Sequence, residues 1–231
     1  GNPLRSDPTT CRLAAAPVEW DDNDAGMKFN PVIWTRAGVY EMTTEQALTT
    51  NRFSEQFGYA SGRAATKVKN YMTDYVQEFI RNSPFTVMAS SDEEGNCDAS
   101  PKGGKPGFVK VLDDRHLLLP DVAGNRLFQS YQNVEANPHV GLIFFIPGVN
   151  DTVRVNGRVT IADKEELERR NVEVSLYEID DRSMHLQGII IEVEESYGHC
   201  PRALHFSHLW NTEEISANQA KRPISERSTN S

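Results

Sequence analysis

The feature that most constrains the fold is a series of six short strand-like segments with few helices between them. Residues 139–147 (HVGLIFFIP) form a continuous apolar run, which is typical of a strand buried on both faces. Residues 153–161 (VRVNGRVTI) alternate apolar and polar side chains, and the apolar face holds Val153, Val155, Val159 and Ile161. This spacing predicts a small antiparallel barrel rather than a doubly wound parallel sheet. The other four segments are 85–91, 107–112, 116–120 and 186–196.

Helices are expected at four places. Residues 64–82 carry apolar side chains every three or four positions, which predicts one helix with a single buried stripe. That stripe consists of Val68, Tyr71, Met72, Tyr75, Val76, Phe79 and Ile80. The other expected helices span 43–56, 123–138 and about 200–210.

The chain is expected to hold one folded domain, residues 63–213, with an extension at each end. Residues 1–62 lack clear periodicity but contain several large apolar side chains, among them Trp20 and Trp34. They are therefore expected to form an irregular and helical extension that packs on the barrel or on a partner subunit. Residues 214–231 are expected to be a polar C-terminal tail.

The charge and the cysteines argue against several classes of protein. The formal net charge is −9, whereas a general nucleic-acid binder needs an excess of Lys and Arg. No stretch approaches the roughly 20 apolar residues of a membrane span. The three cysteines, Cys11, Cys97 and Cys200, are too scattered for a disulfide framework, which favours a reducing cytoplasm.

A local run of glycine and lysine, SPKGGKPGFVK at residues 100–110, stands out in this acidic chain. Glycine lets a backbone approach a ligand, and its N–H groups can point at an anion, while Lys102, Lys105 and Lys110 add positive charge. Arg126 is expected to begin the helix of residues 123–138, where the helix dipole also favours an anion. The pattern predicts either a phosphate cradle or a solvated basic turn.

The joint pattern SPKGG, PGFVKVLDD, PDVAGNR, NPHVGLIFFIPG and VRVNGR, with the ending HCPRALHFSHLWNTEE, resembles the pyridoxamine 5'-phosphate oxidase-like family of FMN-binding split barrels. The resemblance covers about residues 70–213. It implies a mainly β fold with flanking helices, built as a six-stranded antiparallel split β-barrel. It also implies a homodimer that binds FMN in clefts at the subunit interface.

The resemblance assigns the flavin phosphate to Lys102, Lys110 and Arg126, with hydrogen bonds from Ser100, Gly103 and Asn125. It further implies that Phe108 and Val109 lie along the flavin, and that Leu119, Pro120 and Asp121 edge its ring or ribityl chain. Arg154 is expected either to reach the flavin or a partner subunit, or to form a cross-strand ion pair.

His199 is a weak candidate for a proton donor near the flavin; the alternative is that Cys200 is a small buried group and Pro201 starts a helix. No metal site is predicted, because the sequence has no paired CxxC near its histidines.

The expected function is that of an FMN-dependent oxidoreductase with an unknown small-molecule substrate. One alternative is a true pyridoxamine or pyridoxine 5'-phosphate oxidase, although the arginine-rich C-terminal segment of those enzymes does not map onto this chain. The others are a non-catalytic flavin carrier or sensor, and a relative that binds haem or the deazaflavin F420.

Overall fold

A computed structural model of the chain describes residues 32–35, 38–41, 52–122, 128–179 and 183–224. Contacts divide the chain into two units, residues 1–62 and 63–231. In the first unit, β1 (Val32–Thr35) and β2 (Gly38–Glu41) form an antiparallel pair. Helix α2 spans Arg52–Phe57 and corresponds to the C-terminal part of the helix expected at 43–56. Residues 42–51 lie outside the described residues.

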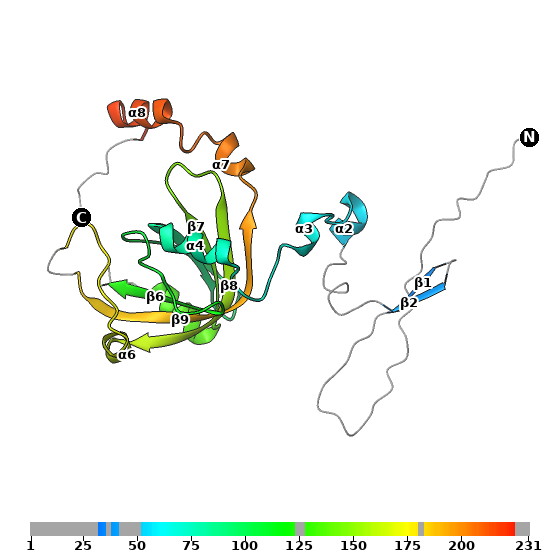
Figure 1. Cartoon of the computed structure of the whole chain (residues 1–231), viewed down its shortest axis with the longest axis horizontal. Coiled ribbons are helices and arrows are strands. Elements are labelled where there is room, and N and C mark those ends of the chain that lie inside the picture. The colour runs from blue at the N-terminus through cyan, green and yellow to red at the C-terminus, as the bar shows by residue number, and fades with distance from the viewer. Residues whose placement is uncertain (1–31, 36–37, 42–51, 123–127, 180–182, 225–231) are drawn as a thin grey trace, which may run out of the picture. The chain divides into compact units, whose positions relative to one another are not determined.

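The second unit is built on one antiparallel sheet with the strand order β4-β3-β7-β8-β9-β6-β5 (Figure 1). The expectation of a mainly β, antiparallel fold with flanking helices is confirmed, but the described residues form seven strands where six were expected. The strands are β3 (Phe85–Ser91), β4 (Cys97–Gly103), β5 (Lys110–Val111), β6 (His116–Val122), β7 (His139–Phe145), β8 (Thr152–Asp163) and β9 (His185–His199).

The strand that the sequence pattern missed is β4, which reads CDASPKG and has no apolar alternation. It lies at one edge of the sheet and pairs only with β3. Pro101, opposite Val87, has no N–H to donate, and an edge strand tolerates this because one side has no neighbour. Conversely, the strand expected at 107–112 is reduced to Lys110 and Val111.

The sheet curves until its two edges approach each other. The edge strands β4 and β5 are consecutive in the chain, and the six residues 104–109 between them can span at most about 25 Å. Lys102 Nζ, on β4, lies 3.3 Å from both carboxylate oxygens of Asp121, on β6. The two longest strands, β8 and β9, are paired and curve together (Figure 1).

The main hydrophobic core lies on the face of the sheet that we call the inner face. Leu117, Leu142, Phe144, Val153 and Ile191 are fully buried there. Helix α4 (Asp74–Asn82) adds Val76, Phe79 and Ile80 to the same core. On the opposite, outer face, helix α6 (Lys164–Arg169) covers a smaller cluster of Leu118, Ala162 and Leu167.

The prediction of a single helix at 64–82 is wrong. The structure has two helices there, α3 (Arg63–Thr66) and α4, with a non-helical segment between them. In this segment Lys69 pairs with Ser196 of β9: the Lys69 N–H donates to the Ser196 carbonyl at 3.1 Å, and the reverse bond is 2.7 Å. Thr73 then caps α4 by accepting from the Val76 N–H. Backbone pairing with β9 thus replaces the helical hydrogen bonds that the apolar spacing suggested. Of the expected stripe Met72, Val76, Phe79 and Ile80 are buried, whereas Val68, Tyr71 and Tyr75 are exposed.

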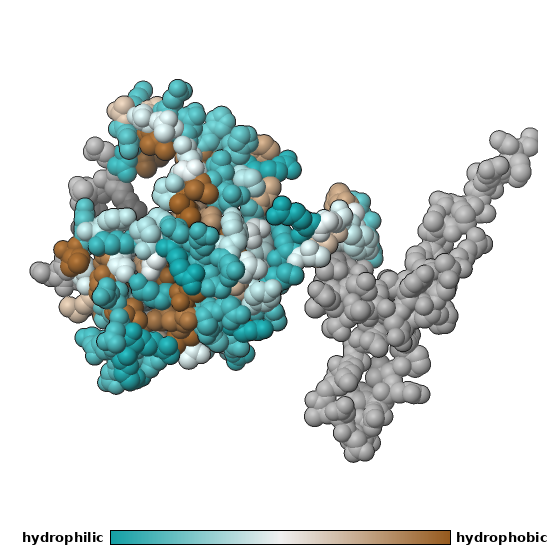
Figure 2. All heavy atoms as spheres, in the orientation of Figure 1, coloured by the Kyte–Doolittle hydropathy of each residue, from teal (hydrophilic) through white to brown (hydrophobic). Residues whose placement is uncertain are grey.

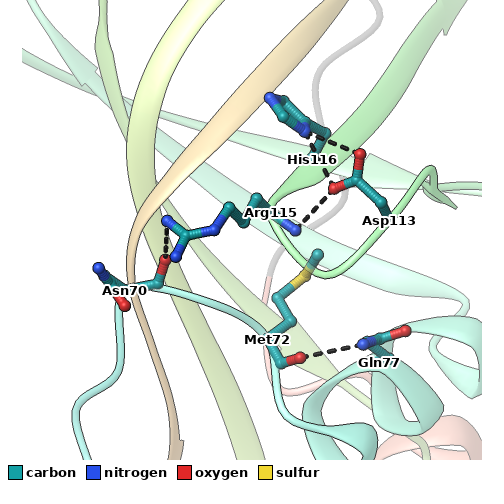
Figure 3. Close-up of polar contacts among 6 residues, drawn as sticks. All are labelled: Asn70, Met72, Gln77, Asp113, Arg115 and His116. Carbon is teal, nitrogen blue, oxygen red and sulfur yellow. Dashed lines mark hydrogen bonds and ion pairs between the residues drawn. The ribbon is translucent and has the colours of Figure 1, made fainter.

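A turn before β6 holds the same segment in place (Figure 3). The Met72 N–H donates to the Asp114 carbonyl at 2.7 Å, and the Arg115 guanidinium reaches the Asn70 carbonyl at 3.5 Å. Gln77 Nε2 donates to the Met72 carbonyl at 3.0 Å. The connection between α3 and α4 is therefore bound on two sides, by β9 and by this turn.

The remaining helices differ from expectation at their ends. Helix α5 (Gln129–Ala136) stops at Asn137 as predicted, while residues 123–127 lie outside the described residues. The helix expected near 200–210 is α7 (Arg202–Phe206). The region expected to be a polar tail from residue 214 includes most of α8 (Thr212–Ala220), a helix that buries no residue. The Asn211 side chain caps it by accepting from two backbone N–H groups.

Ile161 lies on the inner face as expected, opposite Ile189, but it is 38% exposed. Its neighbour Ala162 faces α6 and is buried. Among the helices that the structure describes, none is long and apolar enough to cross a membrane.

Candidate functional site

A polar cluster lies where the two edges of the sheet approach each other, and we call it the rim cluster: Lys102, Asp121, Tyr131 and Gln187. Lys102 pairs with Thr86, which is fully buried, so Lys102 lies on the inner face of β4. Asp121 follows the buried Leu119 by two positions on β6 and lies on the same face. The Lys102–Asp121 ion pair is only partly exposed, at 18% and 24% of the two side chains.

Tyr131 and Gln187 complete the rim cluster. Gln187 is the cross-strand partner of Asp121, and Tyr131 comes from α5. Burial, followed by the negative charge of Asp121 and a hydrogen bond to it, raises the pKa of Tyr131 far above its ordinary value. The Tyr131 hydroxyl therefore stays protonated and acts as a donor toward the Asp121 carboxylate.

Helix α5 is fixed to the sheet by three side-chain hydrogen bonds. Ser130 Oγ donates to Asp98 of β4 at 2.7 Å. Asn133 and Asn137 donate to Ser90 and Ser91 of β3, each at 3.0 Å. These bonds set the position of Tyr131 relative to β4.

Lys110 lies elsewhere, on the outer face of the sheet. It is the cross-strand partner of Leu118, which belongs to the cluster beneath α6. Lys110 Nζ donates to the Gly107 carbonyl at 2.9 Å and to Ser175 Oγ at 3.1 Å. Burial and the positive charge of Lys110 lower the pKa of His185, which lies nearby at the start of β9.

The glycine-lysine loop itself is packed closely against the segment that contains Ser175. The Lys105 N–H donates to the Ser175 carbonyl at 2.7 Å. A Cβ on Gly104 would lie 2.5 Å from that carbonyl oxygen and 2.7 Å from Phe108 Cβ, so only glycine fits there. The loop is therefore an ordered structure and not a freely solvated turn.

The other residues that the resemblance assigned to the flavin are spread over different environments. The side chains of Phe108, Val109 and Leu119 are at most 5% exposed and lie in the main core. Ser100 and Pro120 are half-buried, and Gly103 is exposed. Asn125 and Arg126 lie outside the described residues.

Arg154 belongs to a second group of polar side chains, on the outer face, that we call the outer cluster: Lys67, Arg154, Tyr197 and His199. Tyr197 is the cross-strand partner of Arg154. The Arg154 Cζ lies 5.6 Å from the Tyr197 ring centroid, and Lys67 Nζ lies 4.8 Å from it. The His199 and Tyr197 rings are 6.1 Å apart, centroid to centroid.

These positions bear on the expected cross-strand ion pair of Arg154. Its cross-strand neighbours are Ile143 and Tyr197, and it forms no ion pair with any residue that the structure describes. The ion-pair expectation is therefore not met within the described part of the chain. His199 is exposed at the end of β9, and burial and the positive charges of Lys67 and Arg154 lower its pKa. Cys200 is exposed and not the small buried group of the alternative reading.

Sequence reasoning missed Lys67, Tyr131, Ser175, Gln187 and Tyr197. Lys67 falls within the helix expected at 64–82, which is not helical at that position. For Tyr197, simple alternation along 186–196 would have placed it on the apolar face with Ile191 and Val193. The register shift opposite Asn156 and Gly157 moves it to the outer face, beside Arg154. No group of three or more His, Cys, Asp or Glu side chains in the described ranges is arranged to hold a metal ion.

Several proteins of known structure are similar to this chain. A pyridoxamine 5'-phosphate oxidase homologue from Lactobacillus delbrueckii has 19% identity and a TM-score of 0.43, over 57% of this chain and 99% of the other. HupZ of Group A Streptococcus has 17% identity and a TM-score of 0.41, over 55% and 93%. A conserved hypothetical protein from Mycobacterium tuberculosis has 18% identity and a TM-score of 0.41, over 58% and 88%. Such likenesses say nothing about ligand or reaction.

No curated protein matches the chain. The family model described as pyridoxamine 5'-phosphate oxidase matches residues 72–200, which is more than half of the 231 residues and includes every strand of the seven-stranded sheet. The chain belongs to the pyridoxamine 5'-phosphate oxidase family.

Proposed function

We propose that the chain is a cytoplasmic FMN-binding oxidoreductase that acts on a small-molecule substrate and works as a homodimer. The observation that carries the proposal is the family match over residues 72–200, which contains an ordered glycine-lysine loop ending in Lys110. Members of this family include flavin-dependent oxidoreductases, which supports FMN as the cofactor and oxidation–reduction as the reaction class.

The donor set around the loop fits a phosphate. Lys110 contacts only neutral acceptors in the described part of the chain, a carbonyl and a hydroxyl, so its charge is not balanced by a carboxylate. A phosphate oxygen is a stronger partner for an ammonium group than either acceptor. Lys102 is a weaker candidate, because Asp121 already balances its charge.

We assign the FMN phosphate to Lys110 with Arg126. Lys102, Tyr131 and Gln187 lie on the opposite, inner face and form a separate set of polar groups. Bound FMN supplies hydride chemistry at its ring, whereas the protein supplies binding, orientation and electrostatics. Tyr131 can donate a hydrogen bond without losing its proton, because its pKa is raised. No residue is assigned as a catalytic acid or base.

The finer fold proposal is a split barrel in which β4 and β5 are two parts of one interrupted strand. Counted in this way the sheet has six strands, and residues 104–109 close it. The outer face of β3, β4 and β7 supports the proposed dimer: Phe85 is 39% exposed, and Val87, Ile143 and Phe145 are only half-buried. Figure 2 shows one face of the molecule, on which hydrophobic areas interrupt the hydrophilic surface.

The proposal is tested by adding excess FMN to the purified protein, removing the unbound fraction and recording the absorption spectrum. Wild type should retain the two flavin bands. Lys110→Ala and Arg126→Ala should each weaken FMN binding about tenfold or more, since each removes a charge-assisted contact. Lys164→Ala is the matched control, because this exposed lysine of α6 forms an ion pair with Glu168 and lies outside the proposed site.

The outcomes separate the alternatives. Absence of retained flavin would overturn the proposal, and an intense band in the violet after addition of haem would replace it with haem binding. Retained F420 instead of FMN would change the cofactor. Hydrogen peroxide release from pyridoxamine 5'-phosphate would identify a true oxidase, and bound flavin without turnover of any substrate would indicate a carrier or sensor.

A further inference from the structure

We propose that Lys67, Arg154 and His199, gathered around the ring of Tyr197, bind the carboxylate or phosphate group of a small-molecule ligand. That this ligand is the substrate rests on the proposed function, whereas binding of an anion at the outer cluster does not. The outer cluster is separate from the rim cluster, because Arg154 lies on the outer face and Lys102 on the inner face of the sheet.

The main argument for the proposal is that the positive charges of Lys67 and Arg154 are not balanced by a carboxylate in the described part of the chain. Lys67 and Arg154 lie 4.8 Å and 5.6 Å from the centroid of one neutral ring, and neither forms an ion pair with any described residue. Two positive charges on one small area repel each other, and an anion between them relieves the repulsion. The planar guanidinium of Arg154 matches the oxygen pair of a carboxylate or a phosphate.

The acidic groups nearest in the sheet do not fill this role. Glu195, two positions before Tyr197, accepts a hydrogen bond from Asn156 Nδ2 at 2.9 Å. Burial, followed by the negative charge of Asp151, raises the pKa of Tyr75, so Asp151 lies near a different side chain. Glu194 pairs with His139 at 3.8 Å. None of these carboxylates forms an ion pair with Lys67 or Arg154.

The outer cluster is also pre-organised. Arg154 and Tyr197 are neighbours on paired strands, and His199 is two residues further along β9. Lys67 comes from the connection between α3 and α4, which is bound to β9 through Lys69 and Ser196. Three separate parts of the chain are therefore held together before any ligand binds.

The protonation of His199 provides a direct measure of anion binding at the outer cluster. Burial and the two positive charges lower its pKa, so its ring is neutral near pH 7. An anion bound beside it would favour the protonated ring and raise its pKa. This change can be followed by NMR from the ring proton signals of His199, which are assigned by their loss in His199→Gln.

The experiment titrates the full chain with inorganic phosphate and with acetate, in chloride buffer, with and without saturating FMN. We expect saturable shifts of the His199 signals, an increase in its pKa, and affinity at least about tenfold weaker in Lys67→Ala and in Arg154→Ala. Arg158→Ala should behave as wild type, since it removes the same charge from an exposed position of β8. Dispersion of the NMR spectrum shows that each variant is folded.

Two results would overturn the proposal. The first is the absence of saturable His199 shifts up to roughly 50 mM of either anion. The second is equal binding by wild type and both variants. Loss of the phosphate effect when FMN is added would show that the flavin itself occupies the outer cluster, which overturns the assignment to a substrate. FMN retention is measured separately by absorption, so failure of flavin binding is distinguished from failure of anion binding.

Discussion

At the scale of single residues, the sequence pointed to particular charged side chains but carried no information on the side of the sheet on which each one lies. The resemblance grouped Lys102 and Lys110 around one phosphate. In the structure they lie on opposite faces, and Lys102 forms an ion pair with Asp121. A one-residue change of register moves a side chain to the other face, and no local pattern in β4 specifies that register.

Gly104 gives the clearest prediction at this scale. Gly104→Ala should lower the free energy of unfolding by about 1–3 kcal/mol, because its Cβ would collide with the Ser175 carbonyl and with Phe108. Urea unfolding followed by circular dichroism measures the change. Gly103→Ala is the control, because its Cβ would lie 3.5 Å from the nearest atom, which is ordinary contact. Equal destabilisation by the two substitutions would show that the loop is not packed as described.

At the scale of secondary-structure elements, strongly apolar segments were predicted well. Strand β7 and the C-terminal half of the helix expected at 64–82 are where the pattern placed them. The first half of that helix is absent, because the backbone of Lys69 is paired with Ser196, 127 positions later in the chain. A spacing pattern reports which side chains can share a face, but it carries no information about a distant backbone partner.

Ser196 tests this connection. Its Oγ donates to the Tyr71 carbonyl at 2.6 Å, and the residue is 1% exposed. Ser196→Ala should therefore lower the free energy of unfolding by about 1–3 kcal/mol, since the Tyr71 carbonyl loses its partner in a part-buried hydrogen bond. It should also speed hydrogen exchange of the Lys69 amide. Ser207→Ala is the control, because its hydroxyl bonds to the Leu204 carbonyl on an exposed helix. Unchanged exchange at Lys69 would contradict the proposed role of Ser196.

At the scale of the whole molecule, the chain divides at Gly62, between an N-terminal unit and the unit that carries the family match. We predict that the N-terminal extension packs on the barrel or on the partner subunit, since it contains large apolar side chains such as Trp20 and Trp34. Deletion of residues 1–40 should then lower the melting temperature or weaken dimerisation.

Thermal unfolding and analytical ultracentrifugation measure these two effects. Removal of residues 225–231, a polar stretch, is the control and should change neither. If deletion of residues 1–40 also leaves both unchanged, the extension contributes nothing to the stability of the fold or of the dimer.

The sequence by itself determined the class of the fold, because alternation and apolar runs are local consequences of which side chains are buried. The family could also be identified from the sequence. The matched residues, 72–200, include every strand of the seven-stranded sheet. Only the tertiary structure decided which charged groups meet. Each polar cluster draws its residues from separate elements: Lys102 and Asp121 in one case, and Lys67, Arg154 and His199 in the other. Strand order, register and the curvature of the sheet bring these residues together, and none of the three can be read from a local pattern.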